Sequence, residues 1–282
     1  MKKMSASVFN FSVLKSKPLA ADKDGAALAV SFPFIKDGKP LEDAPLCCLS
    51  LKAAGSMRFR WNEPNETREN FFKSLGVDYD SVVAPELIHS KTVFCVDNAD
   101  ELAVFRALRS EGDAVLSVNP AYVPAVTVAD CVPIYLYDSK KHVAGMVHSG
   151  WKGTGIVKEA VERMVHFYTS EPSEICAVIG PHIKDCCYSV DAERADCFKE
   201  KFTPDCVTED GGAFMLSLEK ANIKLLLESG VKSENIAVAE ECTCCTEELG
   251  SHRRETAGCP DNMPIEERSK LFTVMTAFLV CL

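Results

Sequence analysis

The stretch VPAVTVADCVPIYLYD, residues 123–138, is apolar and rich in β-branched residues, a pattern typical of buried strands. A similar run, DAVLSV, residues 113–118, comes before it, and HVAGMVHSG, residues 142–150, comes after it. These strands follow each other directly, whereas GIVKEAVERMVHFYTS, residues 155–170, has apolar residues at helical spacing. The pattern therefore predicts an α+β fold with layered α/β/α architecture, in which helices cover the faces of a mixed sheet.

The remaining elements are predicted from capping residues and periodicity. Asn65 caps a helix that Gly76 ends, and Gly230 ends a second clear helix. Residues 1–50 look irregular, with short apolar pieces between charged turns. The other predicted elements are strands at 85–97, 174–183 and 235–245, and helices at 99–112, 216–231 and roughly 264–278.

Length and charge limit the class of protein. A chain of 282 residues that is 47% hydrophobic can bury a large core, and no linker-like stretch divides it. We therefore expect one domain over residues 1–282, with a less regular N-terminal segment at 1–30. The net charge of −10 argues against nucleic acid as a partner, so an anionic substrate would need a local basic pocket.

Fourteen cysteines are a high number for a chain of this length. Residues 1–17 lack the apolar core of a secretory peptide, and residues 271–282 are too short to span a membrane. We therefore expect a cytoplasmic protein without membrane contact, whose reduced thiols are mostly buried as small hydrophobic residues. The CTCC run at 242–245 has no second CxxC partner, which weakens a structural zinc site, and Cys186 and Cys187 are expected to be packed.

His89, Cys131 and His148 each lie at or near the end of an apolar run. Sheet edges bring such side chains together although they are far apart in the sequence. Two imidazoles and one thiolate suit zinc, and three protein ligands leave a fourth position free, as catalytic zinc requires. The same residues are also compatible with plain core packing, or with a Cys131 thiolate activated by a histidine base. Asp130 is expected either to orient a histidine or to face solvent.

The loop that follows His148 contains three glycines, at 150, 153 and 155, and leads into a predicted helix. Glycines allow the backbone to approach a ligand closely, and free amides at a helix start favour an anion. Lys152 adds positive charge, and Trp151 offers an apolar face on which a base or sugar can stack. A glycine-rich turn is equally typical of a simple tight connection.

Paired basic residues form the next candidate group. Arg253 and Arg254, after His252, are either a phosphate-binding fork or a solvated salt-bridge face. The residues alone favour the solvated face. Arg58 and Arg60 allow the same two interpretations.

Four blocks of the sequence together resemble a known family. They are GDAVLSV…VTVADCVPIYLYD, VAGMVHSGWKGT, VIGPHIKDCCYSV and ECTCC…SHRR, in this order. The chain is identified over roughly residues 30–280 as similar to the laccase-domain proteins. These are also known as YfiH-like proteins, peptidoglycan editing factors or multicopper polyphenol oxidoreductases, and include purine nucleoside phosphorylases.

The resemblance implies fold, site and reaction. The fold would be a layered α/β/α arrangement of mixed sheets, related to cysteine-hydrolase-like toxins. The metal ligands, which are also the catalytic residues, would be His89, Cys131 and His148. The reaction would be phosphorolysis of adenosine and inosine, with adenosine deamination and methylthioadenosine cleavage beside it. Leu87 replaces a usual glutamine and Lys152 a usual arginine, which bears on substrate preference.

These observations together predict a zinc-dependent purine nucleoside phosphorylase whose partners are a nucleoside and phosphate. Lys152, Arg253 and Arg254 are the expected phosphate ligands, Arg58 or Arg60 assist, and Trp151 packs on the nucleoside. The expected assembly is a monomer or a small homo-oligomer. The rival functions are a cysteine amidase or deamidase that edits a peptidoglycan-precursor peptide, a copper-dependent polyphenol oxidase, for which six histidines are few, and a non-catalytic scaffold.

Overall fold

The computed structural model describes residues 6–9, 18–260 and 262–281. A large sheet at its centre has the strand order β1-β17-β13-β11-β12-β9-β8. Its strands run parallel at both edges and antiparallel around β11, so the sheet is mixed. The bounds are β1 Ser7–Phe9, β8 Val93–Cys95, β9 Ala114–Ser117, β11 Val132–Asp138, β12 Val143–Ser149, β13 Ile175–Ile179 and β17 Ile236–Ala239.

A second sheet packs against one face of the first, and its strand order is β2-β3-β6-β18-β10-β7. It is antiparallel except where β10 pairs with β7. Its strands are β2 Ala20–Ala21, β3 Ala27–Phe32, β6 Leu46–Ser50, β7 Val82–Val83, β10 Val123–Val128 and β18 Met275–Val280. Smaller sheets consist of β14 Ser189–Val190, β15 Val207–Asp210 and β16 Ala213–Leu216, and of β4 Ile35–Lys36 and β5 Lys39–Pro40.

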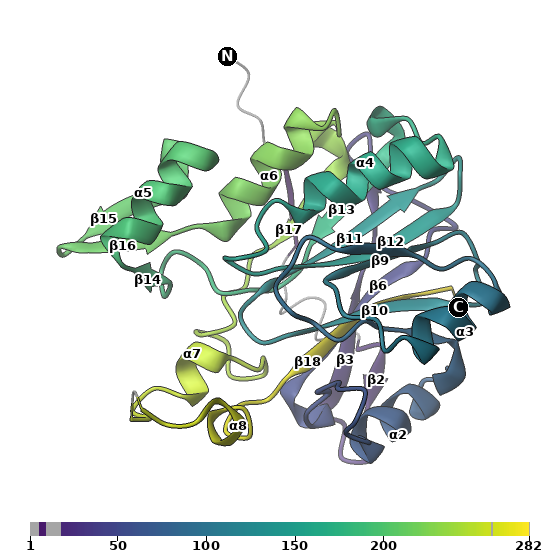
Figure 1. Cartoon of the computed structure of the whole chain (residues 1–282), viewed down its shortest axis with the longest axis horizontal. Coiled ribbons are helices and arrows are strands. Elements are labelled where there is room, and N and C mark those ends of the chain that lie inside the picture. Colours follow the sequence, from purple (N-terminus) through teal and green to yellow (C-terminus); the bar gives the residue numbers. More distant parts are fainter. Residues whose placement is uncertain (1–5, 10–17, 261, 282) are drawn as a thin grey trace.

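Helices cover both sheets (Figure 1). The α-helices are α2 Glu66–Ser74, α3 Ala99–Ala107, α4 Ile156–Tyr168, α5 Ala192–Lys201, α6 Leu218–Glu228, α7 His252–Glu255 and α8 Ile265–Arg268. Short 3-10 helices span Lys52–Ala54, Tyr79–Ser81, Pro172–Glu174, Pro204–Cys206 and Ser233–Asn235. In Figure 1, α5 and the β14–β16 sheet form a lobe at the left, above α7 and α8.

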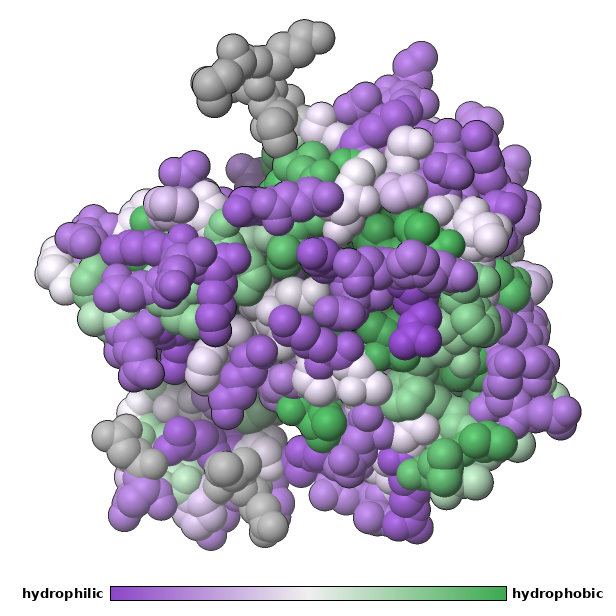
Figure 2. Space-filling view, turned by 45° about the horizontal axis from the view of Figure 1, so that its top comes forward, coloured by the Kyte–Doolittle hydropathy of each residue, from purple (hydrophilic) through white to green (hydrophobic). Residues whose placement is uncertain are grey.

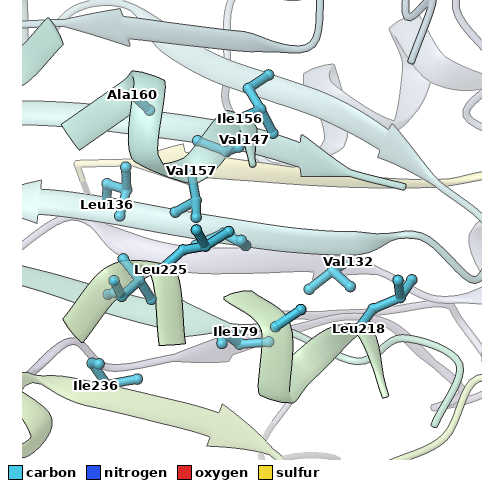
Figure 3. Close-up of a cluster of buried hydrophobic side chains, with 14 of the residues drawn as sticks. Val132, Leu136, Val147, Ile156, Val157, Ala160, Ile179, Leu218, Leu225 and Ile236 are labelled. Carbon is cyan, nitrogen blue, oxygen red and sulfur yellow. The ribbon is translucent and has the colours of Figure 1, made fainter. Parts of the chain in front are cut away.

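The alternation of side chains along β11 shows how the layers stack. Ile134 and Leu136 point to the side of α4 and α6, where they join a buried apolar cluster that includes Val157 and Leu225 (Figure 3). Tyr135, between them, points to the opposite face and joins the core between the two sheets. A third cluster packs α2 against the far side of the second sheet. The predicted α+β arrangement of mixed sheets with helices on its faces is confirmed, and two sheets stack inside it.

Several predicted elements differ from the structure in type or extent; the strand predicted at 235–245, for example, is only β17. The final helix predicted at 264–278 is wrong, because only 265–268 are helical and β18 is a central strand of the second sheet. The strand predicted at 85–97 is reduced to β8. Residues 1–50 are less irregular than predicted, since β3 and β6 are interior strands; the structure leaves 1–5 and 10–17 undescribed.

The surface carries its apolar residues in separate patches among polar ones, as the face in Figure 2 shows. Large exposed apolar side chains such as Leu108 and Phe167 are scattered over different elements. Among the described residues, no helix has the length and apolar character needed to cross a membrane.

Candidate functional site

Strand register brings distant residues to one end of the large sheet. In the β11–β12 pair, Pro133 lies opposite His148, so Cys131, the residue before β11, lies next to the end of β12. Ala114 of β9 pairs with Val147 on one side and with Val93 on the other. Asp113 and the segment before β8, which carries His89, therefore reach the same place.

The three predicted ligands converge there. One nitrogen of His89, one nitrogen of His148 and the Cys131 sulfur all lie within 4.8 Å of one another. The two imidazole rings are 5.0 Å apart between centroids and nearly perpendicular. His148 is buried whereas His89 is exposed, so the group is accessible from one side. His89 also adopts a left-handed backbone conformation, with φ of 59°, of the kind that functional sites often hold.

Asp113 orients both histidines, and the sequence analysis missed this role. Its buried carboxylate accepts a hydrogen bond of 2.8 Å from His148 Nδ1 and another of 3.0 Å from the His89 backbone N–H. The backbone N–H and hydroxyl of Ser90 donate to its other oxygen. Since Nδ1 of His148 is used in this way, Nε2 is the nitrogen left for Cys131 or a metal. Histidines that bind metals are commonly held by such a carboxylate.

The charges of this group support one another. Burial opposes the Cys131 thiolate, but His148 and His89 beside it lower the pKa of the thiol to about 6. Burial also opposes a charged His148, yet Cys131 and Asp113 raise its pKa to about 9. Burial similarly opposes the Asp113 carboxylate, but His148 and Ser90 lower its pKa. Without a metal the group is therefore a thiolate–imidazolium pair backed by a carboxylate.

The glycines of the loop after His148 make room for the ligands themselves. A Cβ atom at Gly150 would lie 2.9 Å from Cδ2 of His89 and 3.0 Å from the Cys131 sulfur. At Gly153, a Cβ atom would lie 2.9 Å from the Ser90 carbonyl oxygen. The glycines thus let this loop pack directly against the segment that carries His89.

A cavity of about 500 Å³ opens over the three ligands. Its size suits a small-molecule ligand. It combines the ligands with aromatic rings and several cationic side chains. The lining includes His89, Cys131, His148, Trp151, Tyr188, Phe272, Arg58, Arg60, Arg194, His252 and Arg253.

Two of the expected phosphate ligands do not line this cavity. Lys152 lies with its Nζ 5.3 Å from the centroid of the exposed Trp151 ring, outside the lining. Arg254 donates instead to the backbone carbonyls of Thr243, Cys244 and Thr246, at 2.6 to 3.2 Å, and also to that of Leu249. Its guanidinium therefore fixes a loop.

Asp130 takes neither of its expected roles. It is buried with φ of 84°, and its carboxylate accepts from the Thr243 hydroxyl and the Arg253 backbone N–H, both at 2.6 Å. Asp130, the residue before Cys131, is therefore linked to the loop after β17 and to the first turn of α7. This contact orients Arg253, whose guanidinium donates to Ser189.

The cavity also contains residues that the sequence analysis did not select. Arg194, from α5, lies 4.0 Å from the centroid of the Trp151 ring, and Tyr188 lies under the Arg253 guanidinium at 5.5 Å. Burial lowers the pKa of His252, which favours its neutral form. Arg194 and Tyr188 lie in sequence contexts that give no signal of this position, whereas His252 belongs to the basic segment that carries Arg253.

A second group of sulfur atoms corrects the interpretation of the other cysteines. The expectation that Cys186 and Cys187 are simply packed is wrong, because Cys186 is exposed and Cys187 half-buried. The CTCC segment has no second CxxC partner, but these two cysteines lie beside it. The sulfurs of Cys186, Cys187, Cys242 and Cys245 all lie within 4.8 Å of one another.

Comparison with known proteins identifies the family of the chain. A family model described as multi-copper polyphenol oxidoreductase laccase matches residues 62–259. A Clostridium acetobutylicum protein named purine nucleoside phosphorylase is 36% identical over 59% of this chain and 68% of its own. A protein named adenosine deaminase, from an unknown prokaryotic organism, is 33% identical over 64% of this chain and 72% of its own.

A solved structure has the same fold. YlmD from Geobacillus stearothermophilus superimposes with a TM-score of 0.71 at 24% identity, covering 88% of this chain and 99% of that one. The chain therefore belongs to the laccase-domain family that the model describes as multi-copper polyphenol oxidoreductase laccase.

Proposed function

We propose that this protein is a zinc-dependent purine nucleoside phosphorylase that acts on adenosine and inosine. One observation carries the proposal: His89, Cys131 and His148 converge beneath a cavity that also contains arginines and aromatic rings. The name of the Clostridium acetobutylicum relative supports the same substrate class. The cytoplasmic location expected from the sequence remains part of the proposal.

The donor set fits a metal ion. Two imidazoles and a thiolate are ligands that zinc accepts, and copper is the alternative that the family description names. His89, Cys131 and His148 would hold the ion, and Asp113 would keep His148 in the required tautomer. When bound, the ion supplies a Lewis acid that polarises a substrate atom in the cavity.

The cationic side chains of the cavity would bind the phosphate substrate. In phosphorolysis a phosphate oxygen bonds to the anomeric carbon of the sugar while the bond from that carbon to the base breaks. Arg253, Arg194 and Arg58 would hold the phosphate dianion by charge-assisted hydrogen bonds and stabilise the charge that shifts in the transition state. Trp151 and Tyr188 offer apolar faces to the nucleoside.

Two other reactions have a specific observation in their favour. The relative named adenosine deaminase makes deamination of adenosine a second candidate activity of the same site. The contact between Cys131 and His148 favours a cysteine amidase or deamidase, because it yields a thiolate at neutral pH. A bound metal would block that nucleophile, so metal content separates the two classes.

The test is a nucleoside assay on the purified full-length chain. Inosine with phosphate should give hypoxanthine and ribose 1-phosphate, and omission of phosphate should stop the reaction. Adenosine tested in parallel distinguishes phosphorolysis, which releases adenine, from deamination, which gives inosine. The Cys131→Ala variant should lose activity. Cys197→Ala is the matched control and should keep it, because Cys197 lies on α5 and belongs neither to the cavity ligands nor to the group of Cys186, Cys187, Cys242 and Cys245. Unchanged turnover by Cys131→Ala would reject the proposal.

A further inference from the structure

Four cysteines outside the cavity ligands form a compact group, which we call the cysteine cluster: Cys186, Cys187, Cys242 and Cys245. The sulfur of Cys186 is 3.8 Å from those of Cys187 and Cys245, and the Cys187 and Cys245 sulfurs are 3.3 Å apart. Four thiolates around one zinc ion at a Zn–S distance of about 2.3 Å have sulfurs about 3.8 Å apart. The cluster therefore has nearly the dimensions of a tetrahedral S4 site.

A backbone N–H group next to the cluster stabilises the thiolate form of Cys242, which is the form that binds a metal. Its sulfur accepts a hydrogen bond of 3.4 Å from the Lys184 backbone N–H. Such N–H donors stabilise a thiolate. Cys242 and Cys245 have the C-x2-C spacing that structural zinc sites use.

Two separate loops are held in place so that their cysteines meet. The backbone N–H of Thr243 donates to the carbonyl of His182 at 3.0 Å, which joins the loop after β17 to the loop after β13. Arg254 fixes the first of these loops through its backbone carbonyls. These contacts bring the two loops together, and a shared metal ion would add a further link between them.

We propose that the cysteine cluster is a second metal site, which binds a thiophilic divalent cation such as zinc with all four thiolates. A site with four protein ligands has no position left for a substrate, which is typical of structural zinc. Cys186 and Cys245 are exposed, so an ion can enter from solvent. The bound ion would fix the loops that carry Tyr188 and Arg253 into the cavity.

The experiment counts metal ions in the full-length protein by mass spectrometry after purification without chelators. Wild type should contain about two zinc ions per chain, and Cys131→Ala and Cys245→Ser about one each. A variant with both changes should contain none, and Cys197→Ser should match wild type. Since each site has its own variant, failure of the cavity ligands to bind zinc leaves the test of the cysteine cluster intact.

A second measurement covers the case in which Cys245→Ser does not fold. Cobalt(II) is added to the folded Cys131→Ala variant, and intense thiolate-to-cobalt charge-transfer absorption is expected, together with protection of Cys186 from alkylation. The proposal is overturned if that variant binds no metal under reducing conditions. It is also overturned if intact-mass analysis shows that a disulfide within the cluster forms while zinc is present.

Discussion

Replacement of Asp113 by asparagine tests the geometry of the cavity ligands most directly. The asparagine side chain has nearly the same shape, but it carries no charge and offers one carbonyl oxygen in place of two carboxylate oxygens. Asp113 accepts four hydrogen bonds, and the bond from His148 Nδ1 is the one that selects the tautomer with Nε2 free for a metal. Loss of such a carboxylate partner typically weakens metal binding about 10–100-fold.

This range corresponds to about 1.4–2.8 kcal/mol of binding free energy, which is close to the value of one charge-assisted hydrogen bond. The assay is a zinc titration of the metal-free protein against a chromogenic chelator. The Cys245→Ser background removes the second proposed site from the measurement. Asp80→Asn serves as the control, because the side chain of Asp80 is largely exposed. If Asp113→Asn binds zinc within about twofold of its parent, the proposed role of Asp113 in tautomer selection is incorrect.

Four further predictions rest on the same contacts. Gly150→Ala should weaken zinc binding about tenfold or more, because its Cβ overlaps the ligand side chains; unchanged affinity would contradict the close packing. In the metal-free protein, alkylation of Cys131 should reach half its maximal rate near pH 6, and a midpoint near 9 would contradict the thiolate pair. The stabilising effect of the thiolate grows as pH rises from about 6 towards 9, whereas that of charged His148 declines from pH 6.5 towards about 9. The two effects offset each other, so the unfolding temperature of the metal-free protein should change little over this range, and a steep change there would contradict the pairing. Arg253→Met should raise the KM for phosphate about tenfold and change the melting temperature little. Arg254→Met should mainly lower the melting temperature and raise that KM by a smaller factor, because it loosens the loop on which Arg253 depends; the reverse pattern would refute these assignments.

Part of the fold is readable in the sequence because local pattern and tertiary context agree. The run at 142–150 is a strand in both, and Asn65 and Gly230 lie at the helix ends where they were predicted. The run at 123–138 is also extended, but it breaks at 129–131 into β10 and β11, which belong to different sheets. β18 shows where this agreement fails. Its sequence, MTAFLV, is a short apolar run that fits a helix or a buried strand equally well, and only its pairing with β6 and β10 decides.

The candidate site likewise contains residues that can be predicted from the sequence and residues that cannot. His89, Cys131 and His148 are chemically conspicuous, so residue types alone make them candidates. Asp113 is not conspicuous, because an aspartate in front of a strand is normally a turn residue. Its role depends on β9 lying between β8 and β12, which no local pattern specifies.

The adjacent arginines show why the phosphate-binding residues are harder to predict from sequence than the metal ligands. Arg253 and Arg254 have the same chemistry and the same sequence context, yet one lines the cavity and the other fixes a loop. The difference arises because Ser251 caps α7 through the Arg254 backbone N–H, while Asp130 accepts from that of Arg253. Short helices of this kind turn successive side chains in different directions.

Two kinds of support hold the parts of the cavity. The cavity ligands depend mainly on strand register in the large sheet, and the loop after β17 reaches them only indirectly, through Asp130 beside Cys131. Arg253 depends on that loop, through Asp130 and Thr243, and the loop begins at the cysteine cluster. Loss of a metal ion from the cluster should therefore disturb phosphate binding while zinc affinity at His89, Cys131 and His148 changes little. The Cys245→Ser variant should accordingly show a raised KM for phosphate and a nearly normal zinc titration; the opposite result would mean that the two halves of the cavity are not supported separately.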